Sequence, residues 1–303
     1  MKKNILLLFG VVIMIIVAGI IIRADNSNGK HNNNSLIPKI DNNSQSNIPK
    51  IDNNSQNIKE IGTWTYDNNI LIDNQSRRLH NSVWGLTSTE KENYTAKSYI
   101  YYKSDGSFGW EWNRPDTEPK NGHIFIAPIY PEVVVGALSG RADYTTPKFP
   151  INYGDVNNWT SEINYRWTFP PKDNYNLAYD LYFLESERGT KKFNVMIWVQ
   201  GHNEGDSIGV VSDGINQYKH FMRNAGDGQY WEWHAFELIN QSDIHQSDIH
   251  YKVDIKKLLD NAFPGVLQDN WIIPGVELGS EVWRGTGRIE RNKYIITMNG
   301  QDI

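Results

Sequence analysis

Residues 177–200 read LAYDLYFLESERGTKKFNVMIWVQ, and this stretch decides the fold class. Large apolar side chains occupy every second position from Leu177 to Phe183 and again from Val195 to Val199. Such a period of two is typical of β-strands, whose successive side chains point to opposite faces. The residues in between, Asp180 and Asn194 among them, therefore share the face opposite the apolar one.

The same alternation continues through most of the chain after Ile61. It recurs at 164–169 and 276–283, and pairs of Asn or Asp with Gly, which favour tight turns, separate the strand-like segments. Residues 253–262 have the spacing of an amphipathic helix, which Pro264-Gly265 ends. Many strands with one helix predict an all-β fold: a two-sheet β-jelly-roll sandwich with a concave substrate cleft and one short amphipathic helix.

Composition limits the possible functions. The chain of 303 residues contains 11 tryptophans and 16 tyrosines, whose rings suit either a β core or a sugar-binding cleft. Its formal net charge of −5 is not the basic footprint of a nucleic-acid-binding protein, so we expect no nucleic-acid partner. There is no cysteine, which excludes disulfides, thiolate catalysis and cysteine-ligated metals.

The first sixty residues differ in character from the rest. Lys2 and Lys3 precede a long apolar run, so residues 1–24 are predicted to be a signal peptide or a signal anchor. Residues 25–60 are rich in Asn and Ser and contain Ile-Pro-Lys-Ile-Asp-Asn-Asn-Ser-Gln twice, which is typical of a disordered tether. Residues 61–303 form the predicted globular domain. The basic start places this domain outside the cell, either secreted or held to the membrane if the segment is not cleaved.

A second duplication lies near the predicted helix. Gln-Ser-Asp-Ile-His occurs at 241–245 and again at 246–250, which is typical of a surface loop. His245 and His250 are the residues here that suggest a metal, but a solvated loop explains them better. We therefore expect no metal and no organic cofactor.

Three motifs lie on the predicted strands: Ala178-Tyr-Asp180, Asn194-Val-Met-Ile-Trp198 and Val276-Glu-Leu-Gly-Ser-Glu281-Val-Trp283. Asn81-Ser-Val-Trp84-Gly85, Trp110-Glu-Trp112 and Tyr130-Pro131 precede them in the chain. Together and in this order they resemble glycoside hydrolase family 12, whose members are endo-β-1,4-glucanases and xyloglucanases on a β-jelly roll. The resemblance covers about residue 60 to the C-terminus.

The resemblance implies a catalytic pair in which one member is substituted. Glu281 matches the acid/base, and Asn194 stands where the family carries its nucleophilic carboxylate. Retaining glycosidases form a covalent ester on that carboxylate; a neutral amide cannot form it, which argues against a conventional retaining mechanism. Asp180 matches the aspartate that hydrogen-bonds the nucleophile, and it could either orient Asn194 or act as a substitute base. Without the neighbouring charge, Glu281 is expected to be ionised at neutral pH.

Aromatic and polar residues near the motifs are predicted to bind substrate. Pyranose rings present C–H faces that stack on aromatic side chains, and polar groups fix their hydroxyls. The predicted substrate-binding residues are Trp64, Asn81, Trp84, Trp110, Trp112, Tyr130, Met196 and Trp198.

Two functions remain open at this stage. The first is an extracellular glycoside hydrolase homologue of the endoglucanase type, directed at a β-1,4-glucan or xyloglucan and possessing an altered nucleophile position. The alternative is a catalytically inactive glucan-binding or surface-adhesion module that keeps the aromatic cleft. A β-glucan polysaccharide is the expected partner in both.

Overall fold

The computed structural model describes residues 59–64, 68–82, 96–115, 129–171, 174–201, 206–223, 231–246 and 248–303. The predicted signal or anchor segment at 1–24 and nearly all of the predicted tether at 25–60 lie outside these residues. Within the described ranges, no helix has the length and apolarity needed to span a membrane.

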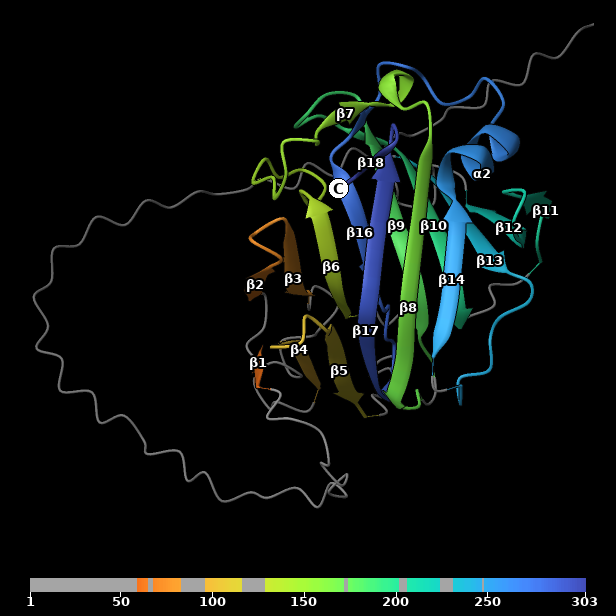
Figure 1. Cartoon of the computed structure of the whole chain (residues 1–303). Coiled ribbons are helices and arrows are strands. Elements are labelled where there is room, and N and C mark those ends of the chain that lie inside the picture. The colour runs from red at the N-terminus through yellow and green to blue at the C-terminus, as the bar shows by residue number, and fades with distance from the viewer. Residues whose placement is uncertain are drawn as a thin grey trace, which may run out of the picture. The chain divides into compact units, whose positions relative to one another are not determined.

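Two β-sheets make up the described domain, as predicted (Figure 1). Sheet A has seven described strands, and six of them follow the order β1-β4-β5-β17-β8-β14, with β18 paired to β17. Their bounds are β1 Glu60–Thr63, β4 Lys97–Lys103, β5 Phe108–Arg114, β17 Gly285–Met298, β8 Trp159–Phe169, β14 Ile249–Asp254 and β18 Gln301–Asp302.

Sheet B has eleven described strands, nine of which follow the order β11-β12-β13-β10-β9-β16-β6-β3-β2. The remaining two, β7 (Ile151–Asn152) and β15 (Ile272–Ile273), pair with each other beside β9. The other bounds are β2 Asn69–Ile72, β3 Arg77–Ser82, β6 Tyr130–Gly136, β9 Asn176–Leu184, β10 Lys191–Gly201, β11 Gly209–Ser212, β12 Gln217–Arg223, β13 Glu232–Leu238 and β16 Gly275–Gly279.

Helix α2 (Ile255–Ala262) directly follows β14, an edge strand of sheet A. It begins two residues later than the sequence predicts, because 249–254 pair with β8 as strand β14. The side chain of Asp254 caps the helix by accepting a hydrogen bond from the main-chain N–H of Lys257 at 3.0 Å. Ile255, Leu258 and Leu259 form the buried face. A one-turn 3₁₀ helix at Tyr153–Asp155 precedes β8.

The core between the two sheets includes two tryptophans that were predicted to bind sugar. Trp110 and Trp112 alternate with Glu111 on β5, and their side chains are 0% and 1% exposed. The indole N–H of Trp110 donates to Ser280 Oγ at 2.9 Å, and the ring of Trp112 packs edge-on against Trp167. The prediction for this pair is therefore wrong, because neither ring has a surface left for a ligand.

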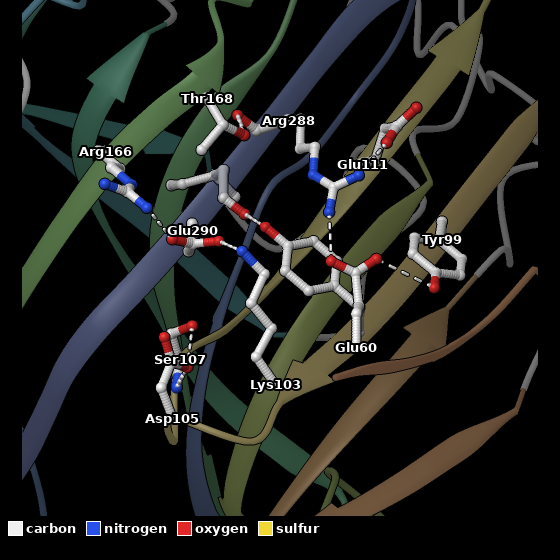
Figure 2. Close-up of polar contacts among 12 residues, drawn as sticks. Glu60, Tyr99, Lys103, Asp105, Ser107, Glu111, Arg166, Thr168, Arg288 and Glu290 are labelled. Carbon is white, nitrogen blue, oxygen red and sulfur yellow. Dashed lines mark hydrogen bonds and ion pairs between the residues drawn. The ribbon is translucent and has the colours of Figure 1, made fainter. Parts of the chain in front are cut away.

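The opposite, outer face of sheet A carries a network of charges (Figure 2). Arg288 on β17 pairs with Glu60 on β1 at 2.7 Å and with Glu111 on β5 at 2.9 Å. Glu290, also on β17, pairs with Lys103 of β4 and Arg166 of β8. These ion pairs link five neighbouring strands.

Two histidines are buried where sheet B meets helix α2. His220 Nε2 and His234 Nδ1 are 2.9 Å apart. Phe236 stacks on the first ring and Phe193 on the second, and Phe263 at the end of α2 meets both edge-on. Burial lowers the pKa of each histidine to about 4, so both are neutral near pH 7.

We expect acid to destabilise the domain through this pair. In the unfolded chain each histidine binds a proton below a pKa of about 6.5, whereas in the folded protein it does so only near pH 4. The contribution of this pair to the free energy of unfolding should therefore fall as the pH drops from 6.5 towards 4. Urea unfolding between pH 7 and pH 5 measures this slope.

The matched variants separate this pair from other titrating groups. His220→Gln with His234→Gln should flatten the slope between pH 6.5 and 5, while His250→Gln, at an exposed position, should leave it unchanged. An unchanged slope in the double variant would contradict the assignment.

Candidate functional site

A cavity of about 490 Å³ lies on the face of sheet B that points away from the core. Strands β3, β6, β9, β10 and β16 and the residues that follow β16 supply much of its wall. Six residues predicted for the site line it: Tyr130, Asp180, Asn194, Met196, Trp198 and Glu281. The alternation of β9 and β10 brings Asp180, Asn194, Met196 and Trp198 there, because their apolar neighbours face the core.

Asn194 is held by strand β9. Its amide nitrogen Nδ2 donates to Asp180 Oδ1 at 2.5 Å and to the main-chain oxygen of Leu181 at 3.2 Å. The other carboxylate oxygen of Asp180, Oδ2, accepts from the Tyr182 hydroxyl at 2.9 Å. Asn194 is 4% exposed and Asp180 is 8% exposed, so this pair is fixed by the protein rather than by solvent.

Two further carboxyl groups, Glu277 and Glu132, sit close to Asp180. Glu277 on β16 lies directly across from it in the strand register. Glu132 on β6 contacts Glu277 and also pairs with His80, whose Nδ1 is 2.9 Å from Glu132 Oε1. Burial raises the pKa of Glu132 and of Glu277 well above the usual range, and for Glu277 the charges of Glu132 and Asp180 add to this.

Asp180 is subject to opposing effects. Burial raises its pKa, while the hydrogen bonds from Asn194 and Tyr182 and the positive charge of Lys191 lower it. The Lys191 ammonium lies 4.0 Å from the centre of the Tyr182 ring and 5.1 Å from that of Trp231. Lys191 is therefore the cation that favours the ionised form of Asp180.

Glu281 is held by Asn176 at the start of β9. Asn176 Nδ2 donates to Glu281 Oε2 at 2.5 Å, and Asn176 Oδ1 accepts the main-chain N–H of Glu281 at 3.1 Å. The main-chain N–H of Asn176 also donates to the carbonyl of Glu281 at 2.9 Å. One fully buried asparagine thus fixes both the backbone and the carboxyl group of the predicted acid.

The protonation of Glu281 differs from the sequence-based expectation. Burial raises its pKa to about 7; the hydrogen bond from Asn176 and the charge of Arg223 lower it, and the charge of Asp180 raises it. We expected an ionised carboxylate because the neighbouring nucleophile charge is missing. That expectation is wrong because desolvation, the largest effect, does not need that neighbour.

The sequence motifs did not indicate most of the aromatic side chains that line the cavity. Trp198 lines the cavity but is 1% exposed, because it packs against Phe221 and Trp233. Trp231, Trp233 and Trp283 also line the cavity. The available signal was Trp231-Glu-Trp233, a second Trp-Glu-Trp in the chain besides the one on β5.

The other predicted binding residues are placed differently. Asn81 is buried on the core side of β3, where its Nδ2 donates to the carbonyl of Ser98 at 2.7 Å; its neighbours His80 and Ser82 line the cavity instead. Trp64 follows β1 and stacks on Tyr99 in sheet A at 4.6 Å, outside the cavity wall. The predictions for Asn81 and Trp64 as cleft residues are therefore wrong. Trp84 lies outside the described residues.

The cavity also contains residues that no motif indicated. Besides the aromatic and charged groups described above, they include Leu138, Ser139 and Arg141. Over the part of the chain that is described, no group of three His, Cys, Asp or Glu side chains has an arrangement that could hold a metal ion.

Removing the amide of Asn176 should raise the pKa of Glu281. The hydrogen bond from Asn176 stabilises the ionised carboxylate, so Asn176→Ala favours the protonated form. The pKa of Glu281 should move above about 7, and ¹³C NMR titration of labelled glutamates measures it. The resonance is assigned by its absence in Glu281→Gln, and an unchanged or lower pKa in Asn176→Ala would refute this role.

The two Trp-Glu-Trp motifs should respond differently to truncation. Trp112→Ala should lower the free energy of unfolding by about 3–5 kcal/mol, because it empties a core position. Trp231→Ala should leave stability within about 1 kcal/mol and weaken binding of soluble oligosaccharide. Thermal unfolding and calorimetric titration test both variants, and equal ligand affinity in Trp231→Ala and the parent would contradict the assignment.

Comparisons with known proteins agree with this architecture. No family model matches the chain. Endoglucanase S of Pectobacterium parmentieri is 26% identical over 231 residues, which cover 73% of this chain and 81% of that protein.

Solved structures show the same fold. A family 12 xyloglucanase from Bacillus licheniformis superposes with a TM-score of 0.64 at 22% identity, covering 79% of this chain and all of that one. Endoglucanase cel12A from Rhodothermus marinus gives a TM-score of 0.59 at 18% identity, covering 81% of this chain and all of that one. The predicted fold is thus confirmed: the chain is similar in sequence to Endoglucanase S and has the jelly-roll fold of these family 12 glycoside hydrolases.

Proposed function

We propose that this chain is an extracellular endo-acting glycoside hydrolase that cleaves a β-1,4-linked glucan or xyloglucan, with Glu281 as the proton donor. The observation that carries the proposal is the setting of Glu281. It lines a cavity with aromatic walls, Asn176 fixes its orientation, and burial raises its pKa to about 7. A general acid is most effective when its pKa lies near the working pH.

The substrate class rests on the relatives and on the cavity wall. Endoglucanase S and the xyloglucanase from Bacillus licheniformis are named for activities on glucans. In this chain, Trp231, Trp233 and Trp283 line the cavity, and Trp283 lies two residues after Glu281 in the sequence. Such rings suit stacking against pyranose faces, and the carboxyl groups and Tyr182 suit hydrogen bonds to hydroxyls.

An inactive glucan-binding module is the second candidate, and one observation favours it. The position of the family nucleophile holds the amide of Asn194, which cannot form a glycosyl ester. Binding through the aromatic wall does not depend on that ester. The two candidates therefore share a ligand and differ in turnover.

An extracellular location accompanies the proposal. Lys2 and Lys3 before the apolar run favour export of the rest of the chain. A long polysaccharide substrate is also encountered outside the cell. The domain would be secreted if the segment is cleaved and membrane-bound if it is not.

Release of reducing ends from soluble β-1,4-glucan and xyloglucan by the full chain tests the function. We expect release by the parent and a loss of at least about a hundredfold in Glu281→Gln, because the proton donor is removed. Lys256→Gln, on the surface of helix α2, is the matched control and should keep the parent rate.

The same assay separates the two candidates. Glucan binding by the parent without any release, together with release by Asn194→Glu, would establish the binding module and reject the hydrolase. Equal rates in the parent and Glu281→Gln would reject Glu281 as the acid.

A further inference from the structure

The hydrogen bonds of Asn194 determine which of its atoms faces the cavity. Both partners of its amide nitrogen, Asp180 Oδ1 and the Leu181 carbonyl, are oxygen acceptors. The two N–H bonds of the amide are therefore directed into the protein. Since Asn194 lines the cavity, the atom left to face a ligand is the amide oxygen Oδ1. An oxygen thus occupies the nucleophile position, though it is formally uncharged.

Asp180 is hydrogen-bonded through both of its carboxylate oxygens, Oδ1 to Asn194 and Oδ2 to Tyr182. Its side chain lines the cavity together with Asn194 and is 8% exposed. The hydrogen bond that it shares with Asn194 Nδ2 places it to take a proton from that atom.

We propose that Asn194 Oδ1 is itself the nucleophile and that Asp180 accepts the amide proton, so that the two residues together replace the missing carboxylate. This inference rests on the proposed hydrolase function. Amide oxygens are competent for the step, since substrate-assisted glycosidases use the acetamido oxygen of the sugar in the same way. Here the amide belongs to the protein, so the substrate needs no such group.

The first step can be written with its protons and electrons balanced. Glu281 donates its proton to the glycosidic oxygen, and the bond from that oxygen to the anomeric carbon C1 breaks. Asn194 Oδ1 forms a bond to C1, which places positive charge on the amide and makes Nδ2–H acidic. Asp180 takes that proton, leaving a neutral glycosyl imidate on Asn194.

The second step restores the enzyme. Water attacks C1, the Glu281 carboxylate takes a proton from the water, and the bond from C1 to Oδ1 breaks. The electron pair returns to the amide, and Asp180 gives the proton back to Nδ2. The net reaction consumes one water, and two displacements at C1 retain its configuration.

The surroundings of Asp180 suit a group that gains and returns a proton. Lys191 and Tyr182 favour its ionised form in the resting state, whereas burial and the facing Glu277 favour the protonated one. Glu132 and Glu281 are the other carboxyl groups that line the same cavity. Burial is the largest of these effects and leaves the pKa of Asp180 raised, which favours its taking up a proton.

The anomeric form of the product tests the proposal. With the full chain and 4-nitrophenyl β-cellotrioside as probe, ¹H NMR in the first minutes should show the β-anomer, which is retention. The α-anomer would mean direct attack by water. It would overturn the nucleophile assignment and leave the proposed hydrolase function intact.

Variants test the two residues separately. Asn194→Ala and Asp180→Asn should each lower kcat by at least about a hundredfold, while cellotriose binding by calorimetry shows that the cavity remains folded. Asn113→Ala, an exposed asparagine on β5, is the matched control and should keep the parent kcat. Parent-like turnover in Asn194→Ala would overturn the proposal.

Trapping identifies the reacting residue. A 2-deoxy-2-fluoro-β-cellotriosyl fluoride should add one glycosyl mass to the parent, located on the peptide that contains Asn194, and none to Asn194→Ala. A label on another residue would overturn the assignment. No release from any glucan by the parent, with release by Asn194→Glu, would reject the hydrolase function and this mechanism together.

Discussion

Strand β9 has one face towards the core and the other towards the cavity. The arrangement of the site depends on which of its side chains lie on each face. Tyr179, Leu181 and Phe183 are buried between the sheets, while Asp180 and Tyr182 line the cavity. Neighbouring strands then place Asn194 and Glu277 on either side of Asp180. A register shift of one residue would exchange the two sets, which would put a carboxylate into the core. The apolar packing of β9 therefore holds the polar site in place.

Burial also sets the proton chemistry of the cavity. For Asp180, Glu132, Glu277 and Glu281, desolvation is the largest effect on the pKa, and in each case it favours the protonated form. Neighbouring side chains then shift the pKa of individual carboxyl groups, as the hydrogen bond from Asn176 lowers that of Glu281. The substitution at Asn194 consequently leaves the acid poised near neutrality.

Most of the correct sequence predictions came from the alternation of apolar and polar side chains along the strands. It identified the strands of the sandwich, and it assigned Asp180, Asn194, Met196 and Trp198 to the cavity face. The prediction for Asn81 rested on the motif Asn81-Ser-Val-Trp84-Gly85, and β3 (RRLHNS) has no apolar–polar alternation that would have shown which face Asn81 is on.

Composition could not distinguish the two Trp-Glu-Trp motifs, since a ring that stacks on sugar and a ring that fills a core have the same local pattern. Nor could it reveal the link between Asn176 and Glu281, which are 105 residues apart in the chain.

The charge network on the outer face of sheet A has a mechanical consequence (Figure 2). Among the described strands, β1 lies nearest the N-terminus; it has four residues and pairs with β4. A pull on that end of the chain would first load this short edge strand. Arg288 on β17 forms ion pairs with Glu60 on β1 and with Glu111 on β5. In the sheet, β5 lies two strands inward from β1, and β17 lies next to β5. The ion pairs thus spread such a load from the edge into the middle of the sheet, where fourteen residues of β17 can bear it.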